Sequence, residues 1–520
     1  MCMKKIYLLL LSLSMGLSSV CADGIERTYT NVPAGGLLSL IMEDEVDPFT
    51  ITKLTLTGQL NGTDLRLIRE MAGNNYLGQL TKGSLKELDL SGADIVAGGE
   101  KYLDTDNITY PTGTYAPYIG ENSFHYETEN NILGQLLFAG CYKLEEVILP
   151  NNLTSIGDYV FSYCLNLKSL EIPKNVSSIG WRFIDGPNNI SKLSVAEGNQ
   201  TFSSPDSSNV LMQGTKLIFG LRSSKVPAGT TIIGSEAFYN CTELGDVTLP
   251  EGVTTIEVGA FAWSGLTSIK MPSTLTTIEN DAFADCNCLT SFTLPKSVTH
   301  YGDGQEGGLG ALKECYYLTS IKVEDGNPKY DSRDSCNAII ETATNTLVSG
   351  CKNTVIPNTV TIIGHQAFRG INLSDFEIPN WITTLGERAF WCSSLTSIKI
   401  PNSVTKIGEL AFENCDYLTS VSVEANTPLV ITGNTFTNRA NATLYVPEGC
   451  VETYKAAPVW REFKNIRPIK NSSGIHCVEL TDGETFDVFN LKGLKVKSQA
   501  TSYDGLPKGI YIVKGKKVMK

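Results

Sequence analysis

The sequence has few of the residues from which catalytic and metal centres are built. Its 520 residues include only four histidines, at positions 125, 300, 365 and 476. Cys286-Asn287-Cys288 has no partner cysteine pair and no nearby histidine, so it does not match a zinc site. Carboxylates are plentiful but unclustered, and no pair of the glycosidase kind stands out. The sequence therefore predicts no catalytic residue, no metal and no cofactor.

Long apolar runs are missing after Leu17, so the sequence predicts no transmembrane segment. The one apolar run, Ile6 to Leu17, follows Lys4-Lys5 and leads to Val20-Cys21-Ala22. This pattern is typical of a secretory signal peptide, residues 1–22, that is cut after Ala22. Lipid attachment at Cys21 is an alternative, although the residues before it match a lipoprotein signal poorly.

An excess of positive charge is missing from most of the chain. The net charge is −13, which argues against nucleic acid as a partner. Residues 470–520 differ, because nine lysines there stand against five acidic residues. Charge alone therefore separates a C-terminal segment from the rest.

What the sequence has is a repeated motif, L-x-x-I-x-I-P-x-x-V-T-x-I-G-x-x-A-F-x-x-C, seen in residues 144–164 and again in 395–415. Its Phe position, which we call the Phe slot, recurs with a period of about 23 residues, and a fixed period of this length predicts a solenoid of stacked repeats. Two steps are much longer, from Ile184 to Phe238 and from Leu312 to Phe368. The slot is filled at residues Phe138, Phe161, Ile184, Phe238, Phe261, Phe283, Leu312, Phe368, Phe390 and Phe412.

Each repeat, or rung, is expected to contain two short strands and a turn. Apolar residues at the first, fourth and sixth places point inward from the first strand, which Pro ends because it has no N–H for the ladder. Val-Thr-x-Ile forms the second strand, and the following Gly is expected to allow a turn with positive φ. Ala-Phe then begins a tight helical or 3₁₀ turn. The final Cys is interpreted as a buried free thiol.

Both long steps contain an insert that begins alike, with Glu197-Gly198-Asn199 in the first and Asp325-Gly326-Asn327 in the second. In each insert two apolar runs flank a polar turn, which predicts a β-hairpin. Cys336 and Cys351 lie evenly about the second turn, so a cross-strand disulfide between them is a candidate. Residues 302–307 spell G-x-G-x-x-G without the strand and helix of a nucleotide loop. They are interpreted as a flexible bulge, with weak calcium binding as an alternative.

The ends of the array follow different patterns. Residues 23–115 are expected to form an N-terminal cap of larger strand-and-helix units, with L-x-x-L-x-L strands at 51–56 and 85–90 and a helix over 64–72. The repeats occupy 116–447. A helical cap in 448–470, with an amphipathic helix from Cys450 to Phe463 that Pro458 breaks, is expected to cover the last rung. A linker at 471–474 leads into a β-rich tail, residues 471–520.

Aromatic residues just after the Phe slot are the candidate partner-binding residues. They are Tyr163, Tyr239, Trp263 and Trp391. Aromatic side chains along one edge of a solenoid suit contacts with proteins or sugars. The alternative is that they only cover neighbouring rungs.

The repeats over 119–447 resemble BspA-like leucine-rich repeat proteins, which are secreted or surface proteins of anaerobic bacteria. Their motif I-P-x-x-V-T-x-I-G-x-x-A-F-x-x-C carries the resemblance, and Val446-Pro447-Glu448-Gly449 is similar to the end of such an array. The tail, with Val488 to Gly493 and Leu506 to Val513, resembles C-terminal sorting domains of type IX secretion. The resemblance implies a β-rich (α/β) solenoid, a right-handed leucine-rich repeat superhelix with short strands and 3₁₀ or helical turns, and a small C-terminal β domain.

The resemblance also implies a function. The expected protein is a non-enzymatic adhesion or interaction protein, exported to the cell surface or outside the cell in association with the outer membrane. Its partner is expected to be a host or bacterial surface protein, or a glycan. A glycan-binding accessory protein of an uptake system is the alternative, and a surface hydrolase ranks third.

Overall fold

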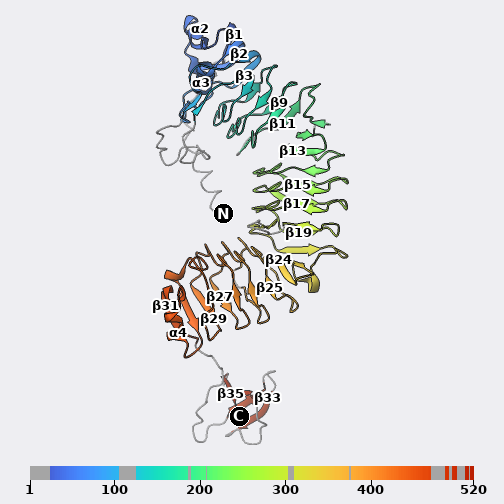
Figure 1. Ribbon diagram of the computed structural model, residues 1–520, viewed down its shortest axis with the longest axis vertical. Helices are drawn as coiled ribbons and strands as arrows, with labels where there is room; N and C mark the ends of the chain where they lie inside the picture. Colours follow the sequence, from blue (N-terminus) through green and yellow to red (C-terminus); the bar gives the residue numbers. More distant parts are fainter. Residues whose placement is uncertain are drawn as a thin grey trace. The chain divides into compact units, whose positions relative to one another are not determined.

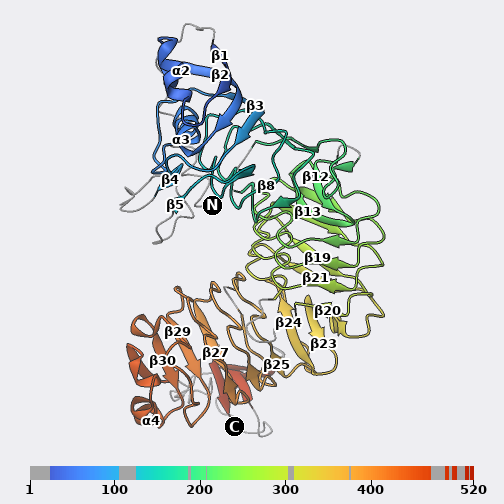
Figure 2. The same cartoon turned by 45° about the horizontal axis from the view of Figure 1, so that its top comes forward.

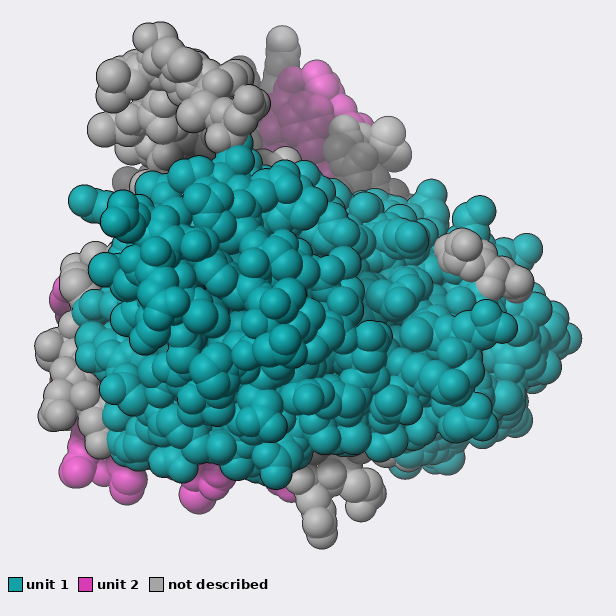
Figure 3. Space-filling view, turned by 90° about the horizontal axis from the view of Figure 1, so that it is seen from above, with its two compact units in different colours: residues 1–357, 365–372 teal, residues 358–364, 373–520 magenta. Residues whose placement is uncertain are grey.

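The computed structural model describes residues 24–104, 125–185, 189–205, 208–302, 310–373, 376–469, 486–490, 495–500, 510–513 and 516–519. The chain forms two compact units, coloured separately in Figure 3. Unit 1 is residues 1–357 with 365–372, and unit 2 is residues 358–364 with 373–520. The predicted signal peptide, the bulge residues after Gly302 and the linker at 471–474 lie outside the described residues.

The N-terminal cap is built from strands that continue into the repeats. β1 (Ile25–Val32), β2 (Ile51–Leu60) and β3 (Glu87–Ile95) are parallel, beside α2 (Leu37–Glu43), η1 (Pro48–Thr50) and α3 (Gly62–Met71) (Figure 1). Leu54 pairs with Leu88, as their matching places in the two L-x-x-L-x-L motifs predict. A capping box of Asn61 and Asp64 starts α3, and Gly73 follows it with a φ of 104°. The sequence did not reveal β1 and α2.

The rungs of unit 1 form two kinds of sheet, as predicted. The longer strands are β7 (Glu146–Ile148), β9 (Ser169–Ile172), β11 (Lys192–Val195), β15 (Gly245–Thr248), β17 (Leu266–Lys270), β19 (Ser291–Leu294) and β21 (Ser320–Val323). The two-residue strands are β6 (Ile132–Leu133), β8 (Ser155–Ile156), β10 (Ser178–Ile179), β14 (Ile232–Ile233), β16 (Thr255–Ile256), β18 (Thr277–Ile278) and β20 (His300–Tyr301). Neighbouring rungs pair in parallel, as β19 and β21 do in Figure 2. A separate antiparallel pair joins β4 (Leu103–Asp104) to β5 (His125–Tyr126).

Unit 2 continues the same pattern and then closes it. Its short strands are β25 (Ile362–Ile363), β26 (Thr384–Leu385) and β28 (Lys406–Ile407), and its longer ones are β27 (Ser397–Ile400), β29 (Ser420–Val423), β30 (Thr443–Val446) and β31 (Asn465–Pro468). Turn η5 (Arg439–Asn441) precedes β30. The covering segment is α4 (Val451–Ala456) followed by η6 (Trp460–Glu462), and it is interrupted at Pro458, as the sequence predicts.

The tail forms its own antiparallel sheet. Its order is β33 (Lys495–Ala500), β32 (Phe486–Phe489), β34 (Ile510–Val513) and β35 (Lys516–Met519). No strand of this sheet is shared with the repeat sheets among the described residues. The small C-terminal β domain that the sequence predicts is thus present.

The Phe slot forms the core. The rings of Phe238, Phe261 and Phe283 stack with centroids 5.2 and 5.5 Å apart and nearly parallel planes. In unit 2 the stack continues from Phe412 to Phe436 at 4.8 Å, a slot residue that the sequence analysis missed. Stacked rings add roughly 0.5–1.5 kcal/mol per pair to their area burial. The repeated Phe therefore supplies much of the rung-to-rung attraction.

The expected role of the repeat Gly is wrong at most rungs, with Gly302, whose φ is 43°, as an exception. Gly157, Gly180 and Gly408 do not have positive φ. Positive φ occurs instead two residues later, as at Tyr159, where φ is 56°. A Cβ on Gly157 would lie 2.7 Å from the backbone nitrogen of Gln135 in the preceding rung. The Gly is needed because two rungs approach closely there, and the left-handed residue makes the turn.

The first insert, residues 197–224, and the second, residues 325–354, contain the predicted hairpins. The first hairpin is β12 (Val210–Gln213) with β13 (Lys216–Gly220), and the second is β23 (Ala338–Glu341) with β24 (Thr346–Gly350). In the second insert, β22 (Tyr330–Asp331) also pairs with β23, and η4 (Arg333–Ser335) lies between these two strands in the sequence. Gly220 and Gly350 occupy Phe slots, since their N–H groups donate to Ala237 and Ala367 as slot residues do. A Cβ on Gly220 would overlap the ring of Phe238. Each insert therefore interrupts the Phe stack with a glycine.

The candidate disulfide between Cys336 and Cys351 is not formed, and both thiols are free. Near the turn the pairing places Glu341 opposite Thr346, a register in which the two cysteines would also face each other. An irregularity between Ile339 and Ile340 shifts this register by one residue, so that Ala338 faces Gly350. Cys351 then lies opposite Asn337 and donates its thiol hydrogen to that residue's carbonyl at 3.3 Å. One bulge thus separates the thiols.

The motif cysteines are free, as interpreted from the sequence, but they are not merely apolar filling. The Sγ of Cys286 donates to the carbonyl of Phe261 in the preceding rung at 3.1 Å. Cys164, Cys315 and Cys415 donate to the preceding slot carbonyl at the same distance. Burial raises the pKa of Cys286 to about 12. These thiols stay protonated at neutral pH, so they serve as buried donors.

Candidate functional site

The turns that follow the two-residue strands form a regular feature of each unit, which we call the turn edge. Each turn contains a Phe slot and a Cys slot, and backbone hydrogen bonds join consecutive turns. The N–H of Phe238 donates to Ala260 at 2.7 Å, and the N–H of Trp263 donates to Ala284 at 2.8 Å. Because this ladder fixes the backbone, side chains on the turn edge are presented by a rigid support.

Trp263 is the candidate residue that the structure exposes most. Half of its surface is open to solvent, and its backbone has a φ of 61°. Val258, in the same turn, is 43% exposed. An indole held by a rigid turn that also exposes a second apolar side chain is the kind of feature that partner proteins contact.

The other three candidates are half-buried. The guanidinium of Arg182 lies 3.5 Å from the ring centroid of Tyr239. Trp391 donates its Nε1 hydrogen to Glu413 of the next rung at 2.7 Å. Tyr163 is also half-buried, with a φ of 56°. For Tyr239 and Trp391 these contacts match the alternative, in which the aromatic residue covers a neighbouring rung.

The four candidates do not occupy one equivalent row. Tyr163 and Trp263 stand two residues after the Phe slot, whereas Tyr239 and Trp391 stand one residue after it. Trp391 also belongs to unit 2 and the others to unit 1. The structure therefore brings together no single site from these four residues.

Three exposed aromatic residues at the turn edge were missed, Trp181, Tyr316 and Tyr317. Trp181 is 53% exposed and directly follows the repeat Gly180. Tyr317 is 52% exposed, follows the Cys315 slot by two residues, and packs its edge against Tyr316 at 5.1 Å. The signal was present in the sequence, since all three are large aromatic residues in variable positions of the motif.

At the first insert the turn edge carries an aromatic cluster around an ion pair. Glu236 accepts from Nε and Nη2 of Arg182 at 2.6 and 2.8 Å, and from Nε1 of Trp181 at 2.6 Å. Arg182 lies over Tyr239 and 4.4 Å from the ring centroid of Trp181. Burial opposes the charge of Arg182, but Glu236 outweighs it and raises the pKa of the guanidinium. The cluster is therefore rigid and locally neutral.

At the second insert the turn edge carries charges instead. Arg369 binds Glu314 through Nε at 2.8 Å and Nη2 at 2.7 Å, and Lys313 binds Asp281 at 2.9 Å. Asp285 lies in the same group. Burial, reinforced by the negative charge of Glu314, raises the pKa of Asp285 to about 7. This cluster changes its charge near neutral pH.

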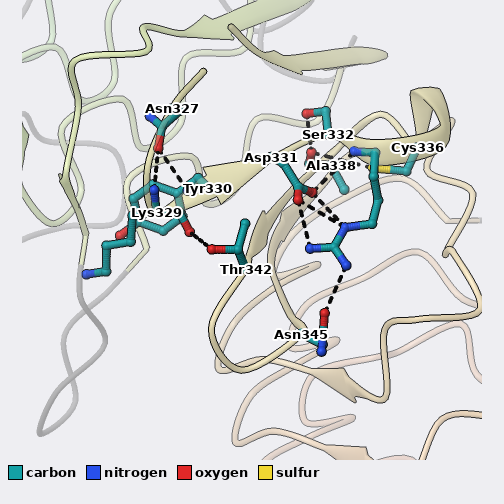
Figure 4. A network of polar contacts seen from close by, with 10 residues as sticks. Asn327, Lys329, Tyr330, Asp331, Ser332, Cys336, Ala338, Thr342 and Asn345 are labelled. Atoms are coloured by element: carbon teal, nitrogen blue, oxygen red, sulfur yellow. Dashed lines mark hydrogen bonds and ion pairs between the residues drawn. The ribbon is translucent and has the colours of Figure 1, made fainter. Parts of the chain in front are cut away.

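The two inserts share an asparagine that joins two rungs, and Figure 4 shows the one in the second insert, Asn327. Asn327 accepts from the N–H groups of Lys329 and Tyr330 at 2.9 and 2.8 Å, and donates to the carbonyls of Pro295 and Val298 at 3.0 and 2.8 Å. Asn199 makes the equivalent four bonds with Thr201, Phe202, Pro173 and Val176. The preceding glycine has positive φ in both inserts, 88° and 85°. The motif Asp/Glu-Gly-Asn thus has a structural role, since its asparagine bonds two neighbouring rungs together.

A second network of polar contacts in the second insert is centred on Arg333 (Figure 4). Arg333 is held by both carboxylate oxygens of Asp331 and donates to Asn345 at 2.9 Å. Ser332 donates to the carbonyl of Ala338 at 2.7 Å. A cavity of about 550 Å³ lies beside this network, between β21 and η4. Two of the charged groups in its wall, Arg333 and Asp331, are paired with each other, which favours a structural role for this pair.

Neither a metal centre nor a membrane helix emerges from the described residues. Within them, no three His, Cys, Asp or Glu side chains are placed to hold a metal ion. None of the helices in this part of the chain has the length and apolar character to cross a bilayer.

The comparisons with known proteins point to the repeats. The model of one protein family, described as "BspA type leucine rich repeat region", matches residues 107–207, 218–333 and 345–457. The two gaps between these matches fall on the hairpins of the inserts. No curated protein matches the chain.

Similar solved structures are bacterial repeat proteins. A leucine-rich cell surface protein from Faecalibacterium prausnitzii is 23% identical, over 68% of this chain and 86% of that one, with a TM-score of 0.35. The pneumococcal vaccine antigen PcpA is 16% identical, over 81% and 74%, with a TM-score of 0.33. A leucine-rich repeat protein from Bacteroides ovatus is 18% identical, over 67% and 80%, with a TM-score of 0.27. With more than half of its length matched by the repeat model, the chain belongs to the family of BspA-type leucine-rich repeat proteins.

Proposed function

We propose that this chain is an exported, non-enzymatic protein of the bacterial cell surface that binds a host or bacterial surface protein through the turn edge of unit 1. The observation that carries the proposal is the exposure of Trp263 and Tyr317, each about half open, on hydrogen-bonded turns. Tryptophan and tyrosine supply most of the binding energy in many protein interfaces. Their rigid support lowers the entropy lost on binding.

The chemistry of the described residues supports a binding role over catalysis. Burial raises the pKa of the motif thiols, to about 11 at Cys415 and about 12 at Cys286, so neither is a nucleophile. The strongest ion pairs, such as Arg182–Glu236, are committed to holding neighbouring turns together. The turn edge does expose large aromatic side chains, Trp263 and Tyr317 among them.

The tail is proposed to sort the protein to the surface. It has its own antiparallel sheet and carries an excess of lysine over acidic residues, unlike the repeats. Residues 471–520 are therefore expected to be needed for location and not for folding of the rungs. In the native host, deletion of this segment should abolish digestion of the protein when intact cells are treated with protease. Normal surface digestion of the truncated protein would rule out a sorting role.

Binding is tested with the purified mature protein on an array of extracellular-matrix proteins, intact bacteria and glycans. Saturable binding to a protein or to bacteria, at micromolar concentration or below, is expected for a specific surface contact. The absence of saturable binding to any protein or cell would contradict the proposal. Binding to glycans alone would favour the accessory role in glycan uptake instead.

A further inference from the structure

A cavity in unit 1 lies beside the aromatic cluster of the first insert. It has a volume of about 330 Å³, within the range of small-ligand pockets. The rung that contains β10, the hairpin strand β13 and the turn after β14 form its walls. The first insert thus supplies part of the wall of this cavity.

One wall of this cavity is the indole of Trp181. Although 53% of this side chain is exposed, its orientation is fixed from three directions. Nε1 donates to Glu236 at 2.6 Å, Tyr159 packs edge-on at 5.3 Å, and the Arg182 guanidinium lies over the ring. A large aromatic surface that is both open to solvent and immobile is ready to stack on a ligand.

The remaining polar groups of the wall are hydroxyl and amide groups from exposed residues. Ser177, Ser178, Ser235 and Gln213 line the cavity, and the hydroxyl and amide groups both donate and accept hydrogen bonds. Arg182 and Glu236 neutralise each other, so neither offers a free charge to a ligand. The buried carboxylate of Asp185, also in the wall, acts electrostatically on Arg182 and adds an acceptor. Two carboxylates beside one guanidinium disfavour an anion, and the hydroxyl and amide groups favour a ligand with many hydroxyl groups.

We infer that this cavity binds a neutral hexose unit of a glycan, with the sugar ring stacked on Trp181 and its hydroxyl groups bonded to the serine and glutamine side chains. A pyranose has an apolar C–H face and a rim of hydroxyl groups, which match an indole face beside hydroxyl and amide groups. The inference goes beyond the proposed function. Its failure would leave the protein-binding role of Trp263 and Tyr317 untouched.

The chain offers a matched control for the test. Trp263 is 50% exposed and does not line the cavity, so Trp263→Ala removes an equally open indole elsewhere. The probes are the methyl glycosides of glucose, galactose, mannose, N-acetylglucosamine and fucose. Binding to the full-length mature protein is measured by calorimetry and by saturation-transfer NMR.

At least one probe is expected to bind with a millimolar Kd, as befits a single sugar on one aromatic platform. Trp181→Ala should weaken that probe at least about tenfold, while Trp263→Ala leaves it unchanged. Trp181→Phe, which keeps an aromatic face, should retain most of the binding. Gln213→Ala, at an exposed side chain, should weaken it and gives an independent test if Trp181→Ala disturbs folding.

Three results would overturn the inference. The first is that none of the five probes binds the wild-type protein at about 10 mM, a concentration above the Kd expected for such a site. The second is equal loss of binding in Trp263→Ala and Trp181→Ala. The third is unchanged binding in folded Trp181→Ala or, if that variant does not fold, unchanged binding in Gln213→Ala.

Discussion

The two inserts have the same backbone framework and opposite chemistry at the turns beside them. In both, an asparagine joins two rungs and a glycine fills the Phe slot, Asn199 with Gly220 and Asn327 with Gly350. The flanking turns differ. Aromatic residues surround a neutral ion pair at the first insert, whereas the second has a group of acidic and basic side chains.

This difference separates two roles within one repeat. The joining asparagine and the slot glycine of each insert, which we call the framework residues, meet requirements of the backbone. Because these requirements are the same in both inserts, the same residue types recur. Residues on the turn edge meet only solvent or a partner, so their chemistry is free to diverge. Tyr239 and Arg369, which follow equivalent Phe slots, illustrate this freedom. Stability is therefore expected to lie in the framework and recognition on the turn edge.

The largest effect is expected from the joining asparagines. Asn199→Ala and Asn327→Ala each remove four hydrogen bonds and leave two carbonyls without this donor, at a cost of about 4 kcal/mol. The two losses should agree within about 1 kcal/mol, because their geometry is the same. Chemical denaturation measures them, with the exposed Gln200→Ala as the control. A loss at only one insert would show that the frameworks are not equivalent.

Next come the glycines that interrupt the Phe stack. Gly220→Ala and Gly350→Ala place a methyl group against the rings of Phe238 and Phe368, which should cost about 2–3 kcal/mol through overpacking. Gly433→Ala, where the added methyl meets open space, should change stability by less than about 0.5 kcal/mol. If all three variants unfold alike, close packing is not the reason for glycine.

The ion pairs should distinguish the two inserts. Glu236→Gln leaves Arg182 without its counter-ion and should cost roughly 1–2 kcal/mol for a pair that is mostly buried. Glu314→Gln should cost less, because it also removes the negative charge that acts on Asp285. Urea denaturation at pH 8 compares the two. A greater loss for Glu314→Gln would contradict this reading of the second cluster.

The smallest expected effect is a pH dependence at the second insert. Folding raises the pKa of Asp285 from 3.8 to about 7, so the folded protein holds this proton more tightly than the unfolded chain does. The stability that this provides is complete below pH 4 and is lost as the pH rises through 7. Asp285→Asn should remove that loss. The stability of the variant relative to the wild type should therefore be greater at pH 8 than at pH 5, by on the order of 1 kcal/mol. If the free energy of unfolding depended on pH in the same way in the variant and the wild type, this prediction would be wrong.

The sequence predicted the rungs because their signal is local and repeated. Two strands, a Phe slot and a Cys slot recur often enough that Ile184 and Leu312 were placed in the slot although neither is Phe, and both are buried. Phe436 was missed because the residues before it, 423–433, do not contain the I-P-x-x-V-T run that precedes the slot in the regular rungs.

Features that depend on a single backbone irregularity or a distant contact were not predictable. The bulge at Ile339 and Ile340 moved Cys336 out of line with Cys351, and nothing in the composition of that hairpin marks it. The partner of Trp181 is Glu236, which lies beyond an insert in the chain. Periodicity places residues within a rung, but it does not show which turns an insert brings together.

The most direct test compares binding and stability in the same variants. Trp263→Ser with Tyr317→Ser should reduce binding to the partner found on the array at least about tenfold, with the melting temperature unchanged, because both side chains are exposed. Asn327→Ala should lower the melting temperature by several degrees and leave the affinity of the remaining folded protein unchanged. Full binding by the double variant, or loss of affinity in folded Asn327→Ala, would contradict the separation of recognition from framework.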